Sequence, residues 1–345
     1  MNKPYIIAEI GVNFYDTARA MQITPIEAAK LYIDSAAKAG VNCAKFQSYK
    51  AETIVSKNSP AYWDTSKEPT KTQYELFKKH DGFGREEYQA LSDYAHSKGI
   101  DFTSTPFDYA SADYLADMVD FYKISSSDMN NLPFVRHIGR KGKPVFLSTG
   151  AAYLSEVEEA VRVLKEASCP EIILLHCVLS YPTDVQNANL RFIQTLKTIF
   201  PNLRVGYSDH CVPDATMTVL SAAYLLGAEV IEKHFTLDKS LPGNDHYHAG
   251  DPNDFRTALQ NFKTINLAMG ASEKTVLPCE RISRREARRS LVLTHDCKAG
   301  HILTEKDIMP KRPGTGISPQ YEEIIIGRPL RCDTSEDTIL TWDMV

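Results

Sequence analysis

The sequence predicts a (β/α)8 barrel followed by a small β-rich domain. Eight short runs rich in Val, Ile and Phe alternate with helical patterns over about 270 residues, which is the size of such a barrel. No Gly-x-Gly-x-x-Gly follows the first run, which disfavours the alternative of a doubly wound open sheet. In the last part of the chain, short apolar runs are separated by turn residues, which is typical of a small β-rich module.

The predicted strands lie at residues 5–10, 42–47, 101–106, 121–126, 144–149, 172–177, 204–209 and 229–235. The clearest helical patterns lie at residues 26–40, 85–99, 155–167, 189–200 and 214–227, and several end at glycine, as helices commonly do. Ser155 and Glu158 have the spacing of a capping box. We assign residues 1–272 to the barrel, 273–288 to a charged linker and 289–345 to the small domain.

Composition and charge exclude several classes of function. A net charge of −5 provides no basic field for nucleic acid, and the chain contains no apolar run long enough for a membrane span. The N-terminus lacks the features of a secretory signal. The seven cysteines lack Cys-x-x-Cys spacing, so we expect free thiols, mostly core fillers, in a reducing compartment. A cytoplasmic protein without nucleic-acid or membrane partners is therefore expected.

Polar residues end every predicted strand, at the face where a barrel places its active site. They are Glu9, Lys45, Gln47, Ser104, Thr105, Lys123, Ser125, Ser126, Ser148, Thr149, His176, Ser208, Asp209, His210, Glu232, Lys233 and His234. A single polar strand end is simply where a chain meets water. Eight of them predict a catalytic centre at one mouth of the barrel.

Two lysines and several hydroxyls among these residues suit a small anionic ligand. The ammonium groups of Lys45 and Lys123, with the hydroxyls of Ser126, Ser148 and Thr149, would bind a phosphate and a carboxylate. Either lysine alone would be a weak signal, because a lysine at a strand end is usually solvated. Two in one barrel mouth predict an anion site.

His210 and His234 end adjacent predicted strands, so their imidazoles could share one divalent ion and leave positions open for substrate. The alternative is that each histidine is a satisfied core group. Glu9, at the end of the first strand, is the candidate general acid or base beside that metal. Its alternative role is a structural ion pair with Lys45, and both roles are compatible.

Nine segments, in order over nearly the whole chain, resemble the sialic acid synthases, meaning N-acetylneuraminate synthase and related nonulosonic acid synthases. They are IIAEIGVN, AKFQSYKAETIVS, TSTPFD, YKISSSD, LSTG, LLHCVLSYPT, GYSDH, IEKHFTLDKSLPGNDH and KRPGTGISP. The resemblance implies a TIM barrel with an antifreeze-like (SAF) domain swapped onto a partner in a homodimer. It also implies a transferase that condenses phosphoenolpyruvate with N-acetylmannosamine or a related N-acylated hexose. The products would be a nine-carbon 2-keto-3-deoxy acid and phosphate, and the cofactor a divalent metal, Mn²⁺ first and Mg²⁺ or Co²⁺ as alternatives.

The resemblance also implies roles for individual residues. It makes His210 and His234 metal ligands that take part in catalysis, and Glu9 the catalytic carboxylate. The implied phosphoenolpyruvate-binding residues are Lys45, Thr105, Lys123, Ser126, Ser148 and Ser208. The implied sugar-binding residues are Gln47, Asp128, Tyr181, Asp245 and Arg312. Of these, Arg312 would reach from the SAF domain into the neighbouring subunit's site.

Three departures from the family pattern leave the sugar open. Phe14 stands in place of a histidine and should make the sugar-side rim more apolar, Asp128 stands in place of a glutamate, and Val178 in place of a polar residue. N-acetylneuraminate synthase is the first expectation. The alternative is a legionaminic or pseudaminic acid synthase that uses a 2,4-diacetamido-trideoxy hexose. His246 and His248 are expected to line the sugar cleft rather than bind a second metal.

Three other functions are less consistent with the residues. An inactive sugar-binding barrel would not need Glu9, both lysines and both histidines. A phosphoenolpyruvate-dependent synthase of shorter sugar acids would not need the KRPG segment. A metal-dependent lyase running the reverse cleavage would not need groups that bind phosphate.

Overall fold

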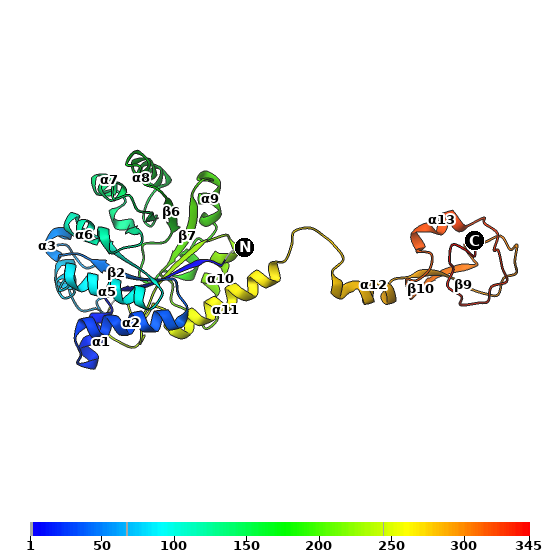
Figure 1. Ribbon diagram of the computed structural model, residues 1–345, viewed down its shortest axis with the longest axis horizontal. Coiled ribbons are helices and arrows are strands. Elements are labelled where there is room, and N and C mark those ends of the chain that lie inside the picture. Colours follow the sequence, from blue (N-terminus) through cyan, green and yellow to red (C-terminus); the bar gives the residue numbers. More distant parts are fainter. Residues whose placement is uncertain (1–2, 67, 244) are drawn as a thin grey trace. The chain divides into compact units, whose positions relative to one another are not determined.

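Eight parallel strands curl into a near-barrel in the first part of the chain (Figure 1). The computed structural model describes residues 3–66, 68–243 and 245–345, and the chain divides into two units, Met1–Gly270 and Ala271–Val345. The strands are β1 (Tyr5–Gly11), β2 (Cys43–Ser48), β3 (Asp101–Pro106), β4 (Tyr122–Ile124), β5 (Val145–Ser148), β6 (Ile172–His176), β7 (Arg204–Asp209) and β8 (Val230–His234). They are ordered β3-β2-β1-β8-β7-β6-β5-β4. The first and last strands of this order, β3 and β4, meet where Thr103 Oγ1 donates to the Phe121 carbonyl over 2.5 Å. The predicted fold class is therefore confirmed.

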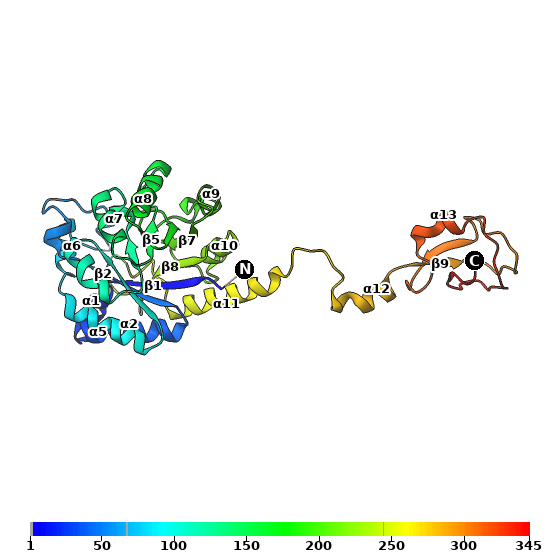
Figure 2. The same ribbon diagram turned by 45° about the horizontal axis from the view of Figure 1, so that its top comes forward.

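Helices surround the strands (Figures 1 and 2). The helices that lead from each strand to the next, or follow the last one, are α2 (Pro25–Ala39), α5 (Arg85–Ser97), α6 (Tyr109–Tyr114), α7 (Leu132–Gly139), α8 (Leu154–Glu166), α9 (Phe192–Ile199), α10 (Thr218–Leu225) and α11 (Pro252–Met269). Three short helices, α1 (Phe14–Met21), α3 (Ala51–Ile54) and α4 (Gln73–Lys78), lie in the first two connections. The connections after β1 and β2 are therefore longer than a simple strand–helix unit requires.

Local backbone chemistry sets the helix starts and corrects three predictions. Helices α9 and α10 begin later than expected, after Asn189 and Met217, whose φ values of 46° and 50° are left-handed and interrupt a helix. Helix α8 begins at Leu154, and Glu156 accepts from the Tyr153 N–H over 2.7 Å. The predicted capping box of Ser155 and Glu158 is therefore wrong, because the helix begins at Leu154 and Ser155 is already inside it.

Side chains alternate along each strand between the barrel interior and the helix layer. A small apolar cluster fills the interior: Ile7, Cys43, Phe121, Phe146, Ile173, Leu175 and Val230. Two residues further along five of these strands, the next interior positions are buried and polar: Glu9, Lys45, Lys123, Ser148 and Glu232. The strands therefore supply an apolar floor and a polar upper layer from one repeating pattern.

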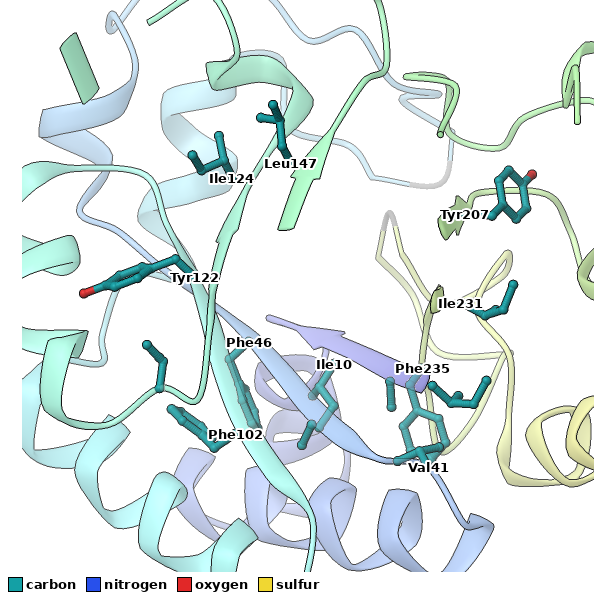
Figure 3. Close-up of a cluster of buried hydrophobic side chains, with 14 of the residues drawn as sticks. Ile10, Val41, Phe46, Phe102, Tyr122, Ile124, Leu147, Tyr207, Ile231 and Phe235 are labelled. Atoms are coloured by element: carbon teal, nitrogen blue, oxygen red, sulfur yellow. The ribbon is translucent and has the colours of Figure 1, made fainter. Parts of the chain in front are cut away.

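The intervening strand residues face the helices and form the larger core (Figure 3). Phe46 and Phe102, on neighbouring strands, have ring centroids 5.8 Å apart, and Ile10, Ile231 and Phe235 are buried in the same cluster. This layer holds the strands in register beneath the helices, and so fixes the positions of the polar interior side chains.

The C-terminal unit is built around a hairpin of β9 (Ser290–Leu293) and β10 (Ile308–Lys311), preceded by α12 (Arg281–Ala287) and followed by α13 (Glu322–Ile325). Isolated bridges join Cys297 to Thr334 and Ile302 to Pro329. Its core comprises Leu291, Leu293, Cys297, Leu303, Ile308, Ile317, Ile325, Leu330, Leu340 and Val345. This is the small β-rich domain predicted from the sequence.

Two expectations from composition concern thiols and membranes. All seven cysteines are unpaired, and four of them, Cys43, Cys177, Cys211 and Cys297, are buried as core residues. Within the described parts of the chain, no helix combines the length and apolar character needed to cross a bilayer.

Gly206 allows β7 to pack against β8, which gives the first testable prediction. A Cβ at this position would lie 2.5 Å from the Val230 carbonyl oxygen and 2.6 Å from Leu175 Cδ2. Gly206→Ala should therefore lower the free energy of unfolding by about 2 kcal/mol or more, measured by urea denaturation. Gly84→Ala is the matched control, because its Cβ would meet only Glu87 Oε2 at 3.7 Å. Equal stability of the two variants would contradict this packing.

Candidate active site

A cavity of about 520 Å³ opens at the carboxyl ends of the barrel strands. Every barrel residue to which the family resemblance assigns a role lines it: Glu9, Lys45, Gln47, Thr105, Lys123, Ser126, Asp128, Ser148, Tyr181, Ser208, His210, His234 and Asp245. Arg312 belongs to the C-terminal unit. The fold thus brings side chains from all parts of the barrel sequence into one pocket.

Four charged side chains form a buried network in this cavity. Lys45 Nζ forms an ion pair with Glu9 Oε2 and lies 3.7 Å from Glu232 Oε1. Lys123 Nζ lies 3.9 Å from the same Glu232 oxygen, which also accepts from Ser208 Oγ over 3.0 Å. Two ammonium groups therefore face two carboxylates, and the network is neutral despite its burial.

Burial and neighbouring charges separate the pKa values of the two carboxyls. Burial raises the pKa of Glu9 to about 6, with Lys45 opposing the shift and Glu232 adding to it. For Glu232, burial acts in the same direction, but Lys123 and Lys45 outweigh it and lower its pKa. Glu9 can therefore exchange a proton near neutral pH, whereas Glu232 keeps its charge between the lysines.

A second group of residues surrounds Lys123. Its Nζ donates to Ser148 Oγ over 2.6 Å and to the Ile124 carbonyl over 3.2 Å. Gly150, just beyond β5, lets the backbone approach Ser126 closely, since a Cβ at this position would lie 3.0 Å from Ser126 Oγ. On the other side of the network, Lys45 Nζ donates to Thr105 Oγ1 over 3.2 Å. Hydroxyl groups thus accompany both lysines, as an anion site requires.

His210 and His234 lie side by side, with ring centroids 5.5 Å apart. His210 Nδ1 is 2.8 Å from the Val178 carbonyl, which can only accept, so the Nε2 lone pair of the neutral ring is free for another partner. His234 Nδ1 is buried, and it has no hydrogen-bond partner among the described residues. Burial lowers the pKa of both rings, that of His210 to about 4, so both are neutral at pH 7.

The sugar-side candidates lie around these histidines and Glu9. The Tyr181 ring is 4.3 Å from that of His210 between centroids, and Asp245 Oδ2 is 3.8 Å from His234 Nδ1. Gln47 Nε2 donates to Glu9 Oε1 over 2.8 Å. Asp128, in the turn after β4, has its pKa raised to about 6 by burial, although Ser127 and Lys123 oppose the shift.

Five of the polar strand ends do not line the cavity, contrary to the expectation that all would converge. Ser104, Thr149, His176, Asp209 and Lys233 occupy the alternate positions. Lys233 Nζ instead donates to Asp209 Oδ2 over 2.6 Å, and His176 Nε2 contacts the Ala188 carbonyl at 2.9 Å. The two-residue period of a strand explains the error, because consecutive residues point to opposite faces.

Two further expectations are corrected at the rim. Phe14 is fully buried, with its ring 4.9 Å from that of Phe83, so it belongs to the core rather than to the sugar-side rim. His246 is also buried, and its Nδ1 lies 2.7 Å from Thr236 Oγ1. His248 packs against His234, with ring centroids 5.1 Å apart, behind the cavity wall. Neither histidine lines the cleft as expected.

The sequence identifies Glu232 as a polar residue at a strand end. It does not reveal that Glu232 lies between Lys45 and Lys123 in the cavity. The available signal was the strand pattern itself: Val230, Glu232 and His234 alternate along β8, so the glutamate and the histidine must share the interior. Its position between two lysines could not be inferred without the register of β8 against β1, which pairs Glu9 with His234.

Two family models match the chain and cover both units. The NeuB family model matches residues 32–274, and the SAF domain model matches residues 288–345. Together with the barrel and its polar mouth, these matches define an enzyme of the sialic acid synthase type. The chain belongs to the NeuB family and carries a C-terminal SAF domain.

Three relatives illustrate the range of this family. The N,N'-diacetyllegionaminic acid synthase of Legionella pneumophila is 36% identical over 99% of this chain and 94% of that protein. The N-acetylneuraminate-9-phosphate synthase of Drosophila melanogaster is 31% identical over 96% of this chain and 93% of that protein. The crystal structure of an N-acetylneuraminic acid synthetase from Leptospira borgpetersenii, in complex with citrate, has a TM-score of 0.70 and 33% identity, covering 82% of this chain and 90% of that one. The class is therefore a nonulosonic acid synthase.

The buried charge network gives the second testable prediction. Glu232→Gln should destabilise the protein by about 3 kcal/mol, because it leaves an uncompensated ammonium group in the cavity. Adding Lys123→Met should recover part of this loss, since the remaining Lys45 and Glu9 charges balance. The measurement is a double-mutant cycle of urea unfolding at pH 7.

The control is Glu229→Gln, which breaks exposed ion pairs with Arg204 and Lys197 and should cost less than about 1 kcal/mol. Strict additivity of the Glu232 and Lys123 substitutions would show that the two side chains are not coupled.

Proposed function

We propose that this protein condenses phosphoenolpyruvate with N-acetylmannosamine or a related N-acylated hexose. The products would be a nine-carbon 2-keto-3-deoxy acid and inorganic phosphate. The observation that supports this best is the combination in one cavity of two buried lysines, their hydroxyl partners, a carboxyl with a pKa near 6 and two neutral histidines.

Phosphoenolpyruvate would bind between the two lysines. Its phosphate and carboxylate would take over the contacts that Lys45 and Lys123 now make with Glu9, Glu232, Thr105 and Ser148. The pKa of Lys45 is raised, because Glu232 and Glu9 outweigh burial, so this side chain stays charged for the anion. Positioning by charge-assisted hydrogen bonds would thus supply much of the rate acceleration.

The histidine pair fits a divalent metal, with Mn²⁺ as first choice. Both rings are neutral, as ligands must be, and the Nδ1–H of His210 is fixed by the Val178 carbonyl, the arrangement commonly found for ligating histidines. The buried Nδ1 of His234, which lacks a hydrogen-bond partner among the described residues, is consistent with an additional ligand near this ring. When bound, such a cation would act as a Lewis acid on the aldehyde oxygen of the sugar.

The proposed reaction forms one C–C bond, consumes one water molecule and releases one phosphate. C3 of phosphoenolpyruvate forms a bond to C1 of the open-chain sugar while the C=O π bond of the aldehyde opens, and the aldehyde oxygen takes up a proton to become a hydroxyl group. A water molecule adds to C2. Glu9, with its pKa near 6, would accept a proton from that water. The C2–O bond to phosphate then breaks as the new C2 hydroxyl becomes the keto group and its proton passes to the phosphate, which Lys123 and Ser148 would hold.

The sugar would extend toward Gln47, Asp128, Tyr181 and Asp245 on the open side of the cavity. A second candidate sugar, the 2,4-diacetamido-trideoxy hexose of legionaminic or pseudaminic acid synthesis, is favoured by one observation. The legionaminic acid synthase of Legionella pneumophila shares 36% identity with this chain, compared with 31% for the Drosophila neuraminate-9-phosphate synthase.

Arg312 would complete the site from a second copy of the chain in a domain-swapped homodimer. Its segment is fixed to the SAF core, because Ser290 Oγ donates to the Pro313 carbonyl and accepts from the Gly316 N–H, each over 2.8 Å. The Arg312 side chain itself is exposed. A rigid loop that presents an exposed guanidinium suits recognition of an N-acyl oxygen. The unpaired cysteines support a reducing compartment such as the cytoplasm.

The test is release of phosphate from phosphoenolpyruvate with Mn²⁺ and each of three sugars. These are N-acetylmannosamine, its 6-phosphate and a 2,4-diacetamido-trideoxy hexose. Release that needs one sugar and stops with EDTA would support the proposal and name the sugar. Sugar-independent release would contradict it.

The third testable prediction concerns His234. His234→Ala should weaken Mn²⁺ binding by at least about 100-fold, because one of two imidazole ligands is lost, and should abolish turnover while the fold is retained. Binding is measured by calorimetry and folding by circular dichroism. His96→Ala is the control, because His96 is exposed and pairs with Asp120. Full activity of the His234 variant would refute the metal assignment.

The fourth prediction concerns Arg312. Arg312→Ala should raise the KM for the sugar by about 10-fold, the cost of one hydrogen bond to a charged group, and leave the KM for phosphoenolpyruvate nearly unchanged. Arg331→Ala, another exposed arginine of the same unit, should change neither constant. A larger effect on phosphoenolpyruvate than on the sugar would argue against this role.

A further inference from the structure

A cluster of four metal-binding side chains lies in the C-terminal unit. One ligand atom each from His295, Cys297, His301 and Asp307 can be chosen so that all four lie within 4.8 Å of one another. The sequence alone does not predict a metal site here, because the spacing His-x-Cys-x3-His-x5-Asp is not a familiar zinc motif. Cys297 and Asp307 are buried, whereas His295 is exposed.

The hydrogen bonds around His295 leave one contact unexplained. Thr294 Oγ1 donates its proton to the Lys306 carbonyl over 2.8 Å, so toward His295 Nδ1, at 3.0 Å, it can only accept. The proton of the neutral imidazole therefore lies on Nδ1. The lone pair of Nε2 then faces Asp307 Oδ1 at 3.3 Å, which is repulsive unless a cation or an additional proton lies between them.

The Asp307 carboxylate is buried and already fixed at its other oxygen. Oδ2 accepts from the Thr304 N–H over 2.7 Å and from Thr304 Oγ1 over 2.8 Å, and His301 Nε2 lies 3.0 Å away. A second imidazole therefore converges on the same carboxylate. Oriented imidazole nitrogens held by outer hydrogen bonds are typical of ligating histidines.

The backbone holds Cys297, His301 and Asp307 in place. Cys297 and Thr334 exchange two hydrogen bonds of 2.9 Å, the Thr294 N–H donates to the Asp307 carbonyl over 2.9 Å, and the Leu330 N–H donates to that of His301 over 2.9 Å. Ligand atoms of a tetrahedral zinc ion lie about 3.3–3.8 Å apart, so side-chain rotation has to bring any two ligand atoms closer by about 1.5 Å at most.

We propose that this cluster is a structural zinc site with two nitrogen, one sulfur and one oxygen ligand. Such a mixed, four-ligand set suits Zn²⁺. The ion would join the end of β9 to the start of β10 and to the connection between them, in a unit whose small core benefits from an additional crosslink. This site is independent of the barrel chemistry.

Co²⁺ titration of the chelator-treated full-length protein tests this proposal, because a cobalt–thiolate bond gives a charge-transfer band in the near ultraviolet that histidine and carboxylate ligands cannot produce. We expect this band, together with the strong visible absorption of tetrahedral cobalt, to be complete by two Co²⁺ per chain in the wild-type protein, because the proposed barrel site can also take cobalt. The band should persist in His234→Ala, which removes the barrel site, and in the control Cys332→Ser, an exposed cysteine of the same unit.

Cys297→Ser should abolish the band, and His295→Gln should weaken cobalt binding by more than about 10-fold. His295 is exposed, so its variant should fold even if that of Cys297 does not. Absence of the band in the wild-type protein would overturn the proposal and leave the contact of His295 with Asp307 as a simple polar contact. Retention of the band in Cys297→Ser, its loss in Cys332→Ser, or unchanged binding by His295→Gln would also overturn it.

Discussion

The candidate site depends on a buried network of four charges, formed by Glu9, Lys45, Lys123 and Glu232. Removing such charges from water is costly, so the network persists only because each ammonium faces a carboxylate and additional hydroxyls satisfy the remaining protons. The same arrangement makes the site ready for an anion. An entering phosphate and carboxylate would compete with Glu9 and Glu232 for the two ammonium groups, and the displaced carboxylates would need another positive partner, such as the proposed divalent cation.

The barrel explains why the network is so compact. Five strands place an apolar residue in the interior and, two residues later, a polar one, as Ile7 and Glu9 do along β1 or Phe121 and Lys123 along β4. The apolar floor excludes water from below, which strengthens the interactions above it. The outer core of Phe46, Phe102 and their neighbours fixes the register on which the distances depend.

Much of the fold and of the candidate site could be predicted from the sequence, and each wrong prediction has a physical cause. The eight strands follow from local patterns, and the cavity residues named by the family resemblance follow from its short motifs. Which neighbour of a strand-end residue faces inward could not be read reliably, so Asp209 and Lys233 were expected in the mouth but pair on the outer face. The burial of Phe14 depends on contacts with a distant segment, including Phe83, for which no local pattern exists. The cluster around Asp307 is local, but its spacing matches no familiar metal-binding motif.

The most direct test of the proposed chemistry follows the bridging oxygen of phosphoenolpyruvate. With ¹⁸O in the C2–O–P bridge, turnover with the accepted sugar should deliver the label to inorganic phosphate, because the proposed reaction breaks the C2–O bond after water adds to C2. Mass spectrometry of the released phosphate measures this. Unlabelled phosphate, with the label retained in the keto acid, would mean that the P–O bond breaks and would contradict the condensation proposed for this barrel.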